Sequence, residues 1–341
     1  MKLGIVGAGM IVHDVLSFLH TVEGIEIAAI CSRKTSFEKA KLLAEKAHIP
    51  LVYEDLEAML EDDKVDAIYV GVPNDQHFAL VKQALLANKH VIVEKPFTSN
   101  YREALELAEL ARKQNRILFE AVSTYYLPNM VHIKDDVQKL GDIRIVTLNY
   151  SQYSSRYDAF KQGVIAPAFD PKLSGGALMD LNIYNLNFVL NLFGEPTNVE
   201  YFANIQNGID TSGLLVMEYP SFKCVCTGAK DCKAPLFNSI QGEKGSIIIQ
   251  TSVSTLSNYQ ILMNDGSRKQ SSTLEAETFN YSDGKHRMYN VFVEFERIVR
   301  ENDRVKADEM LALSVLSMKV QTEARFKAGI IFPADQNEAS K

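Results

Sequence analysis

The chain has 341 residues, of which 46% are hydrophobic and 23% are charged. This length exceeds that of most single domains and predicts two domains with separate cores. The net charge of −7 argues against a nucleic-acid partner, because phosphate binding requires a basic surface. No stretch approaches the roughly 18 apolar residues of a membrane span, and the N-terminus shows no signal-peptide pattern. We therefore predict a cytoplasmic protein whose partners include neither nucleic acid nor membrane.

The N-terminus begins with an apolar strand at residues 2–7, followed by the segment GAGMIV at 7–12. Apolar residues then recur at helical spacing, so the order is strand, glycine turn, helix. This is the context of a dinucleotide-binding fingerprint, in which free N–H groups at the start of the helix face the pyrophosphate. Val12 stands in place of the third glycine, which makes the motif imperfect. The predicted cofactor contacts of this turn are Gly7, Gly9, Met10 and Ile11.

The second strand, residues 25–30, ends in the segment CSRK, where a dinucleotide domain meets the adenosine ribose. An acidic residue there would accept hydrogen bonds from the ribose 2′-hydroxyl. This chain has Ser32 and Arg33 instead, and a guanidinium pairs well with a 2′-phosphate. NADP(H) is therefore the favoured cofactor and NAD(H) remains possible. The alternative interpretation is a solvated basic turn.

Strands and helices then continue to alternate. The predicted elements are a helix at 36–47, a strand at 51–53, a short helix ending at 60, a strand at 67–70, a helix around 80–85, strands at 91–93 and 117–122, and a helix at 128–140. Regular alternation of this length predicts an α/β domain with a doubly wound (Rossmann) parallel sheet. We assign residues 1–122 to this dinucleotide-binding domain, with a bridging helix at 126–140.

The segment VIVEKPF at 91–97 places an acid and a lysine directly after a buried strand. Parallel sheets present ligands at the carboxyl ends of their strands, so Glu94 and Lys95 are expected to face the ligand crevice. A surface ion pair that opens the loop before the helix at 101–114 is the alternative.

From residue 142 onward the pattern changes to short alternating strands separated by turn residues. They lie near 143–151, 199–205, 214–219, 224–228, 239–241, 246–249 and 259–263. Between them, a glycine pair at 175–176 opens a helix through 193, and helices at 287–300 and 308–326 close the chain. This predicts an α+β second domain, residues 123–341, with a mostly antiparallel open sheet.

The four cysteines are Cys31, Cys224, Cys226 and Cys232. The last three are close in sequence, but no fourth ligand at a customary spacing and no nearby histidine accompany them. We predict buried reduced thiols and no metal site.

Several motifs together resemble the glucose-fructose oxidoreductase, inositol dehydrogenase and rhizopine-catabolism (Gfo/Idh/MocA) family of dehydrogenases. They are the N-terminal GAG, VPNDQH at 72–77, VEKP at 93–96, the Glu120-Ala121 pair, SGGALMD at 174–180 and GEKGSIII at 242–249. The resemblance covers nearly the whole chain. It implies that Lys95 contacts the nicotinamide ribose and the reacting hydroxyl, that Asp180 lines the same pocket, and that Tyr184 is the acid/base. The other cofactor contacts predicted from these motifs are Gly71, Pro73, Asn74, His77 and Glu94.

The spacing of Asp180 and Tyr184 agrees with this assignment, because residues four apart lie on one face of a helix. A phenol, whose unperturbed pKa is near 10, accepts a proton from an alcohol only when a neighbouring cation stabilises the phenolate. Lys95 is the candidate cation. In isolation, Asp180 would be read as a polar helix-face residue and Tyr184 as a core aromatic.

Tyrosine at position 184 resembles the branch that contains dihydrodiol and xylose dehydrogenases. Asn182, Tyr125 and Leu127 depart from the residues common in the family, at positions expected near the substrate pocket. The resemblance also implies a homo-oligomer, a dimer or tetramer formed through the open sheet of the second domain.

We predict an NADP(H)-preferring dehydrogenase or reductase that transfers a hydride between nicotinamide and a secondary alcohol or carbonyl of a sugar or cyclic polyol. One alternative is a catalytically inactive sensor or regulator that binds dinucleotide. The other is a redox-neutral hydrolase or epimerase that keeps its cofactor tightly bound. The presence of Lys95, Asp180 and Tyr184 argues against an inactive protein.

Overall fold

A computed structural model describes residues 1–266 and 275–338, so the predicted end of the second domain at residue 341 lies outside the described residues. The chain divides into two compact units. The first contains Met1–Val122 and Met288–Met318, and the second contains Ser123–Arg287 and Lys319–Lys341. The sequence-based division placed everything after residue 122 in the second domain, whereas the structure places Met288–Met318 with the first unit.

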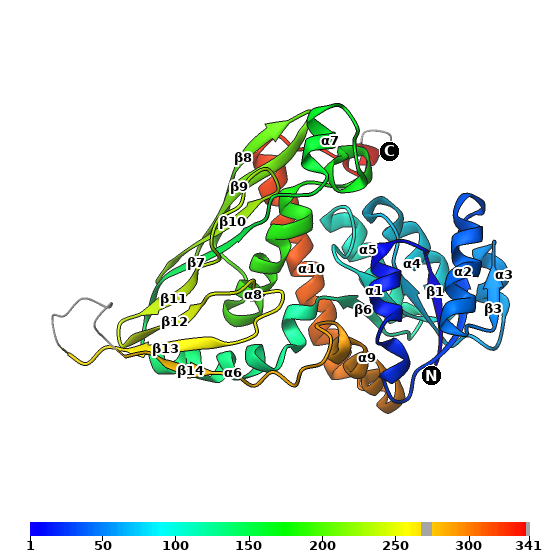
Figure 1. The fold of residues 1–341 in the computed structure, drawn as a ribbon, viewed down its shortest axis with the longest axis horizontal. Helices are drawn as coiled ribbons and strands as arrows, with labels where there is room; N and C mark the ends of the chain where they lie inside the picture. The colour runs from blue at the N-terminus through cyan, green and yellow to red at the C-terminus, as the bar shows by residue number, and fades with distance from the viewer. Residues whose placement is uncertain (267–274, 339–341) are drawn as a thin grey trace. The chain divides into compact units, whose positions relative to one another are not determined.

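The first unit is built on a six-stranded parallel sheet with the order β3-β2-β1-β4-β5-β6 (Figure 1). Its strands are β1 (Lys2–Val6), β2 (Glu26–Cys31), β3 (Leu51–Tyr53), β4 (Ala67–Val70), β5 (His90–Glu94) and β6 (Leu118–Ala121). The chain reverses its winding direction between β1 and β4, and in such sheets ligands bind outside the carboxyl ends of the strands at this switch point. The predicted doubly wound sheet is confirmed.

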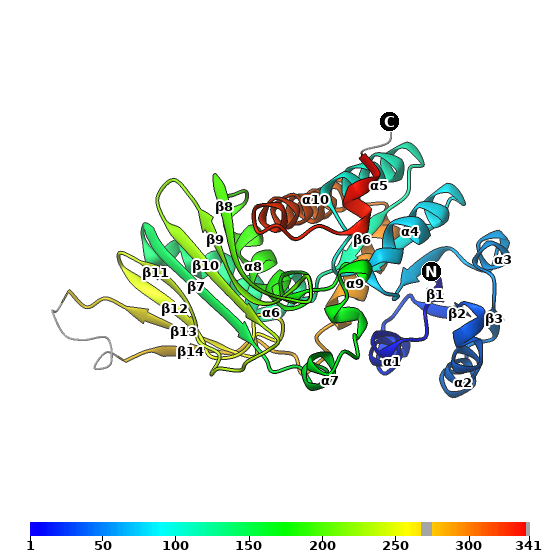
Figure 2. The same cartoon turned by 90° about the horizontal axis from the view of Figure 1, so that it is seen from above.

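Helices cover both faces of this sheet, with α1 and α2 on one side and α4 and α5 on the other (Figure 2). They are α1 (Met10–Leu16), α2 (Phe37–Ala47), α3 (Leu56–Glu61), α4 (His77–Leu86) and α5 (Tyr101–Lys113). Coverage on both sides explains why every residue of β4 is buried. The start of α5 is capped by Asn100, whose side chain accepts a hydrogen bond from the Glu103 amide at 3.0 Å.

Helix α9 (Tyr289–Glu301) belongs to the first unit because its aromatic face packs on that sheet. The Phe292 ring lies 5.4 Å from Tyr69 of β4, and the Phe295 ring lies 5.7 Å from Phe119 of β6. Both phenylalanines are completely buried. Burial of two such rings stabilises this packing by a few kcal/mol, which the position of α9 late in the sequence does not reveal.

The second unit contains an eight-stranded sheet with the order β14-β13-β12-β11-β7-β10-β9-β8. Its strands are β7 (Ile143–Ser151), β8 (Asn198–Gln206), β9 (Ile209–Glu218), β10 (Lys223–Ala229), β11 (Asn238–Gly242), β12 (Gly245–Ile249), β13 (Tyr259–Met263) and β14 (Glu277–Phe279). Neighbouring strands are antiparallel except for the parallel pair β7 and β10. The mostly antiparallel sheet was predicted; the three-residue strand β14 was missed because it is too short to show a period.

Helix α8 (Ile183–Phe193) packs against β7 and β10 (Figure 2). The predicted bridging helix is shorter than expected, because α6 (Pro128–Asp136) changes to a 3-10 turn at Val137–Leu140. A short helix, α7 (Tyr157–Lys161), and the long helix α10 (Arg304–Lys327) complete the fold. Among residues 1–266 and 275–338, none of the helices combines the length and apolar character that crossing a bilayer requires.

Cys31, Cys224 and Cys226 are buried, but Cys232 is exposed, so the prediction of a buried thiol is wrong at that position. Cys232 comes after the last residue of β10 and therefore leaves the alternating, half-buried pattern of the strand. Within the part of the chain that the structure describes, no three His, Cys, Asp or Glu side chains are grouped to hold a metal.

Candidate active site

The carboxyl ends of β1 and β4 approach each other closely at Gly7. The backbone of Gly7 has a φ of +120°, and a Cβ atom there would lie 2.3 Å from the Gly71 carbonyl oxygen. Only glycine fits this position. Gly71 in turn leaves room for Val12, since a Cβ on Gly71 would lie 3.0 Å from Val12 Cγ2. The missing side chain at Gly71 thus accommodates the valine found in place of the third glycine of the fingerprint.

Gly9 precedes α1 and has open space beside its backbone. Its backbone is extended, and a Cβ atom added there would meet no other described atom within 4 Å. Met10 is 68% exposed on the adjacent position. Open space beside the first N–H groups of a helix fits a pyrophosphate, as the sequence predicts for this turn.

Ser32 and Arg33 follow the end of β2, where the cofactor ribose was expected. The Ser32 amide donates to the Tyr53 carbonyl at 3.1 Å, which continues the pairing of β2 with β3. Arg33 is exposed and precedes a 3-10 turn at Lys34–Ser36. A guanidinium on an exposed strand end is accessible to a phosphate, so the residues present fit a 2′-phosphorylated cofactor.

The structure places His77, one of the predicted cofactor contacts, in the interior of the first unit. It is completely buried at the start of α4, with Nδ1 2.8 Å from the Pro96 carbonyl and Nε2 3.0 Å from the Val72 carbonyl. Burial lowers the pKa of this imidazole. With both nitrogens against backbone carbonyls, His77 positions the loop after β5 and the loop after β4, which carries Pro73 and Asn74. Its contact with a cofactor stays a prediction.

Glu94 and Lys95 lie at the carboxyl end of β5, as predicted. Glu94 is buried and accepts a hydrogen bond from the Tyr69 hydroxyl at 2.9 Å. Lys95, which is half-buried, is joined to Pro96 by a cis peptide bond. The end of β5 therefore presents Lys95 next to a fixed carboxylate.

Glu120 of β6 is a second carboxyl group in this region that the prediction did not assign. Burial raises the pKa of Glu120 to about 8, and the charge of Glu94 adds to the effect, while Lys95 acts in the opposite direction. The acid is therefore mostly neutral at pH 7. A buried acid of this kind couples folding to pH.

Glu120→Gln is expected to remove a fall in stability between pH 4.5 and 8. In this window the unfolded state releases the proton that the folded state retains, so the wild-type free energy of unfolding decreases as pH rises. The decrease is on the order of 4 kcal/mol across the window. Urea unfolding at pH 5 to 8.5 measures it, with the exposed Glu109→Gln as control. Parallel profiles for wild type and Glu120→Gln would contradict the assignment.

In the second unit, Asp180 lies in a π-helical turn, Leu178–Asn182, that runs directly into α8. The expectation of one regular α-helix is wrong here. The turn starts against β9: Asp210 accepts a hydrogen bond from the Leu178 amide at 2.7 Å, and a Cβ on Gly176 would lie 2.1 Å from Asp210 Oδ1. Such turns, with their wider i to i+5 bonding, are frequent at functional sites.

Lys230 holds the Asp180 carboxylate. Its Nζ lies 2.8 Å from Asp180 Oδ2, donates to the Ala168 carbonyl at 2.6 Å, and lies 4.4 Å from the centre of the Phe169 ring. The lysine side chain is 2% exposed, whereas that of Asp180 is 33% exposed. The ammonium is thus fully desolvated behind a carboxylate that reaches the surface. Lys230 orients Asp180 and was missed because fifty residues separate them in sequence.

Tyr184 is the second residue of α8 and is half-buried. Its ring lies 5.9 Å from that of Tyr150 at the end of β7. Tyr150 also lines a cavity of about 730 Å³. The other lining residues are mostly hydroxyl or amide side chains: Ser151, Gln152, Tyr153, Lys233, Ala234, Leu236, Gln250, Thr251, Ser252 and Thr255. Most of the lining residues lie at or just after the carboxyl ends of β7, β10 and β12. The strand ends predicted from the sequence were the signal that could have located this cavity.

Two of the departures from the family pattern are structural. Asn182 is completely buried, and its side-chain amide donates a hydrogen bond to the Cys226 carbonyl at 2.9 Å. It packs against Gly228, where an added Cβ would lie only 2.6 Å from the Cβ of Asn182. The Tyr125 hydroxyl donates to Asn187 at 2.9 Å in the core. The Asn182 side chain thus fills the space that the missing side chain of Gly228 leaves on the facing strand.

Comparison with known proteins matches a family model to each part of the chain. Residues 1–122 match an oxidoreductase family with an NAD-binding Rossmann fold, and residues 136–248 match the GFO/IDH/MocA C-terminal domain. The scyllo-inositol 2-dehydrogenase (NADP(+)) IolU of Bacillus subtilis is 33% identical, over 98% of this chain and 99% of its own length. The trans-1,2-dihydrobenzene-1,2-diol dehydrogenase of Mus musculus is 25% identical, over 98% of this chain and 99% of its own length.

A solved structure has the same fold. KijD10, a 3-ketoreductase from Actinomadura kijaniata in complex with NADP, has a TM-score of 0.77 and 21% identity over 96% of this chain and 97% of its own. The predicted fold and the predicted enzyme class, a nicotinamide-dependent dehydrogenase or reductase, are confirmed. The chain therefore belongs to the Gfo/Idh/MocA family of oxidoreductases.

Proposed function

We propose that this protein transfers a hydride between NADP(H), which it prefers to NAD(H), and a secondary alcohol or carbonyl of a sugar or cyclic polyol. The observation that carries the proposal is the ion pair between the buried Lys230 and Asp180, which precedes Tyr184 by one turn. Tyr184 in turn lies near the Tyr150 ring, which lines a cavity that also carries hydroxyl and amide side chains. The name of the Bacillus subtilis relative supports both the cofactor and the cyclic polyol.

The cavity supports a polyhydroxylated substrate. Its volume of about 730 Å³ is in the range of small-molecule sites. Side-chain hydroxyls and amides both donate and accept hydrogen bonds, which suits a ligand whose hydroxyl groups do the same.

Proton transfer is assigned to Tyr184. Bound nicotinamide would supply the hydride chemistry. The Tyr184 phenol would take the proton of the substrate hydroxyl, and the charge of Lys95 would stabilise the phenolate. Asp180, held by Lys230, would accept a hydrogen bond from a substrate hydroxyl and so orient the reacting carbon.

Substrate screening tests the function directly. Aldoses, ketoses, inositols and diols are added to the enzyme with NADP(H) or NAD(H), and the change in nicotinamide absorbance is followed. We expect turnover with at least one polyol or sugar and a preference for NADP(H). Cofactor binding without turnover on any substrate would favour a sensor, and substrate conversion without a net absorbance change would favour a redox-neutral enzyme.

Arg33→Ala is expected to weaken NADP(H) binding by about 1.5 to 3 kcal/mol, as for a charge-assisted hydrogen bond, and to leave NAD(H) binding nearly unchanged. Fluorescence titration of both cofactors measures the effect. Lys39→Ala, which removes an exposed charge on the neighbouring helix α2, serves as the control for general electrostatics. Equal losses for both cofactors, or a wild-type preference for NAD(H), would contradict the proposed phosphate contact.

The proposed assembly is a homo-oligomer formed through the open sheet. Phe202 of β8 and Leu214 of β9 are paired opposite each other and are 63% and 44% exposed. Ile145 of β7, on the same face by register, is 47% exposed. Clustered apolar side chains on one sheet face indicate an interaction surface. Sedimentation of the protein as a monomer at micromolar concentration would contradict this.

A further inference from the structure

The cavity beside Tyr150 lies in the second unit. The first unit contains a different, positively charged cavity of about 260 Å³. It is lined by the end of α5, the start of β6 and the first turns of α10. Arg112, Arg116 and Arg304 line it, and Asp308 is the one acidic residue among its lining residues. Three guanidinium groups against one carboxylate leave a net charge of two in a small space.

The three arginines differ in how they are held. Arg112 Nε lies 3.1 Å from Asp308, and Arg304 donates to Asn302 at 2.8 Å and to the Asn115 carbonyl at 2.9 Å. Nε of Arg116 is inaccessible to solvent, and no residue in 1–266 and 275–338 accepts a hydrogen bond from it. A buried guanidinium nitrogen without an acceptor is costly unless a ligand supplies one.

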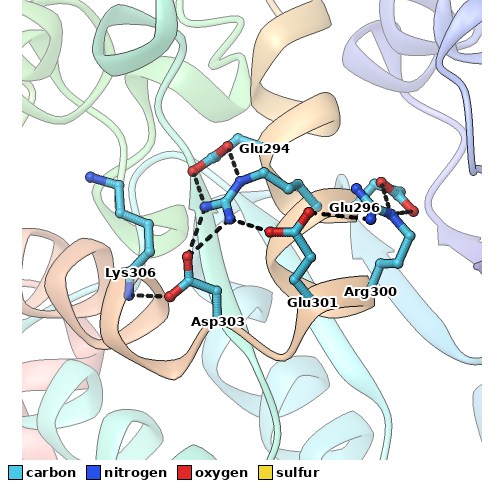
Figure 3. A network of polar contacts seen from close by, with 7 residues as sticks. Glu294, Glu296, Arg300, Glu301, Asp303 and Lys306 are labelled. Atoms are coloured by element: carbon cyan, nitrogen blue, oxygen red, sulfur yellow. Dashed lines mark hydrogen bonds and ion pairs between the residues drawn. The ribbon is translucent and has the colours of Figure 1, made fainter.

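Arg304 directly follows the corner between α9 and α10. Arg297 bridges Glu294, Glu301 and Asp303 in a network of ion pairs (Figure 3). Asp303 also accepts a hydrogen bond from the Lys306 amide at 3.0 Å and thereby caps α10. The carboxylates of this corner are engaged in the network, and the positive end of the α10 dipole adds to the charge of the cavity.

The pKa of a neighbouring histidine, His90, is affected by two of these arginines. His90 Nδ1 accepts a hydrogen bond from the Ile117 amide at 3.0 Å. Burial, together with the charges of Arg116 and Arg304, lowers the pKa of His90 to about 4, and Asp66 opposes this only in part. The charges of Arg116 and Arg304 thus act on His90 in the same direction as burial.

We infer that this cavity binds a small phosphate-class anion, either inorganic phosphate or the phosphoryl group of a small metabolite. Arginine forks match the oxygens of phosphate, and the volume holds a phosphoryl group with a few waters or a short organic chain. The cavity lies at the amino end of β6, whereas Lys95 follows the carboxyl end of the neighbouring parallel strand β5. It is thus separate from the cofactor turn and independent of the proposed function.

Calorimetric titration of the cofactor-free full chain tests the inference, with inorganic phosphate and glycerol 3-phosphate as the two probes at constant chloride. We expect both to bind to wild type, and Arg116→Met to weaken binding at least tenfold while NADPH binding is retained. Lys113→Met, an exposed neighbour on α5 that does not line the cavity, should bind like wild type. Tighter binding of the ester would identify a phosphorylated metabolite as the source; equal binding would assign the site to the phosphoryl group alone.

Phosphate could also occupy the cofactor turn, so Arg33→Ala is measured in parallel. Retained phosphate binding in Arg33→Ala and its loss in Arg116→Met support the cavity. The reverse result, or no binding to wild type at millimolar phosphate, would overturn the inference. If Arg116→Met does not fold, Arg116→Lys keeps the charge but loses the fork, and phosphate binding should still fall severalfold. The imidazole NMR titration of His90 adds a local readout, since a bound anion should move its midpoint to higher pH.

Discussion

Tyr184→Phe is expected to lower kcat by about 10² to 10⁴, with cofactor affinity preserved. The phenylalanine ring keeps the packing against Tyr150 but lacks the hydroxyl that would exchange the proton. Stopped-flow or steady-state measurement of nicotinamide absorbance gives kcat, and fluorescence titration gives cofactor affinity. Tyr150→Phe, which deletes a hydroxyl from the neighbouring ring, is the matched control and should cost less than about tenfold.

Lys95→Met should reduce kcat at least as much as Tyr184→Phe. It removes the charge assigned to stabilising the phenolate and a predicted contact to the cofactor ribose. If the two residues act as one unit, the double variant should lose far less than the product of the two single effects. Near wild-type kcat in Tyr184→Phe would exclude the phenol as the proton acceptor and leave Lys95 itself, or a water held by Asp180, as candidates.

Lys230→Met is expected to destabilise the protein by about 3 kcal/mol, at the lower end of the range for breaking a buried ion pair. The methionine fills the space of the lysine stem, so the cost comes from the lost charge and its hydrogen bonds to Asp180 and Ala168. Asp180 remains partly solvated, which limits the penalty of leaving its carboxylate unpaired. Urea unfolding measures the change, and Lys223→Met at the exposed start of β10 is the control.

The same variant separates positioning from simple folding. If Lys230 orients Asp180, folded Lys230→Met should lose kcat by about tenfold or more, and Asp180→Asn should then have little further effect. Additive losses in the double variant would show that the two side chains act independently. Unchanged kcat in a destabilised protein would reduce Lys230 to a structural role.

The first unit was predictable because its signals are local. Each strand of the parallel sheet is a short apolar run, and Gly7 stands where the turn between β1 and α1 requires a glycine. Gly7 and Lys95 could be placed at strand ends from spacing alone, and the structure puts them there. The role of His77 was not predictable, since burial against the Val72 and Pro96 carbonyls depends on two loops meeting in space.

The second unit shows where local signals end. A four-residue spacing implies one helical face only if the helix is regular, and the π-helical turn at Leu178–Asn182 changes that geometry. This turn is set by its contact with Asp210 of β9, about thirty residues away. Asn182 likewise is explained only by Gly228 on the facing strand.

By itself, the sequence predicted most of the strands and helices, the glycine turn and the basic end of β2, because each depends on neighbours along the chain. The roles of Lys95, Asp180 and Tyr184 were predicted from the family resemblance. The tertiary structure alone decided which distant groups meet. It brought Lys230 to Asp180, packed α9 on the first sheet, and gathered Arg304 with Arg112 and Arg116 around one cavity. Burial and charge act through space, so these pairings follow from packing and not from spacing in the sequence.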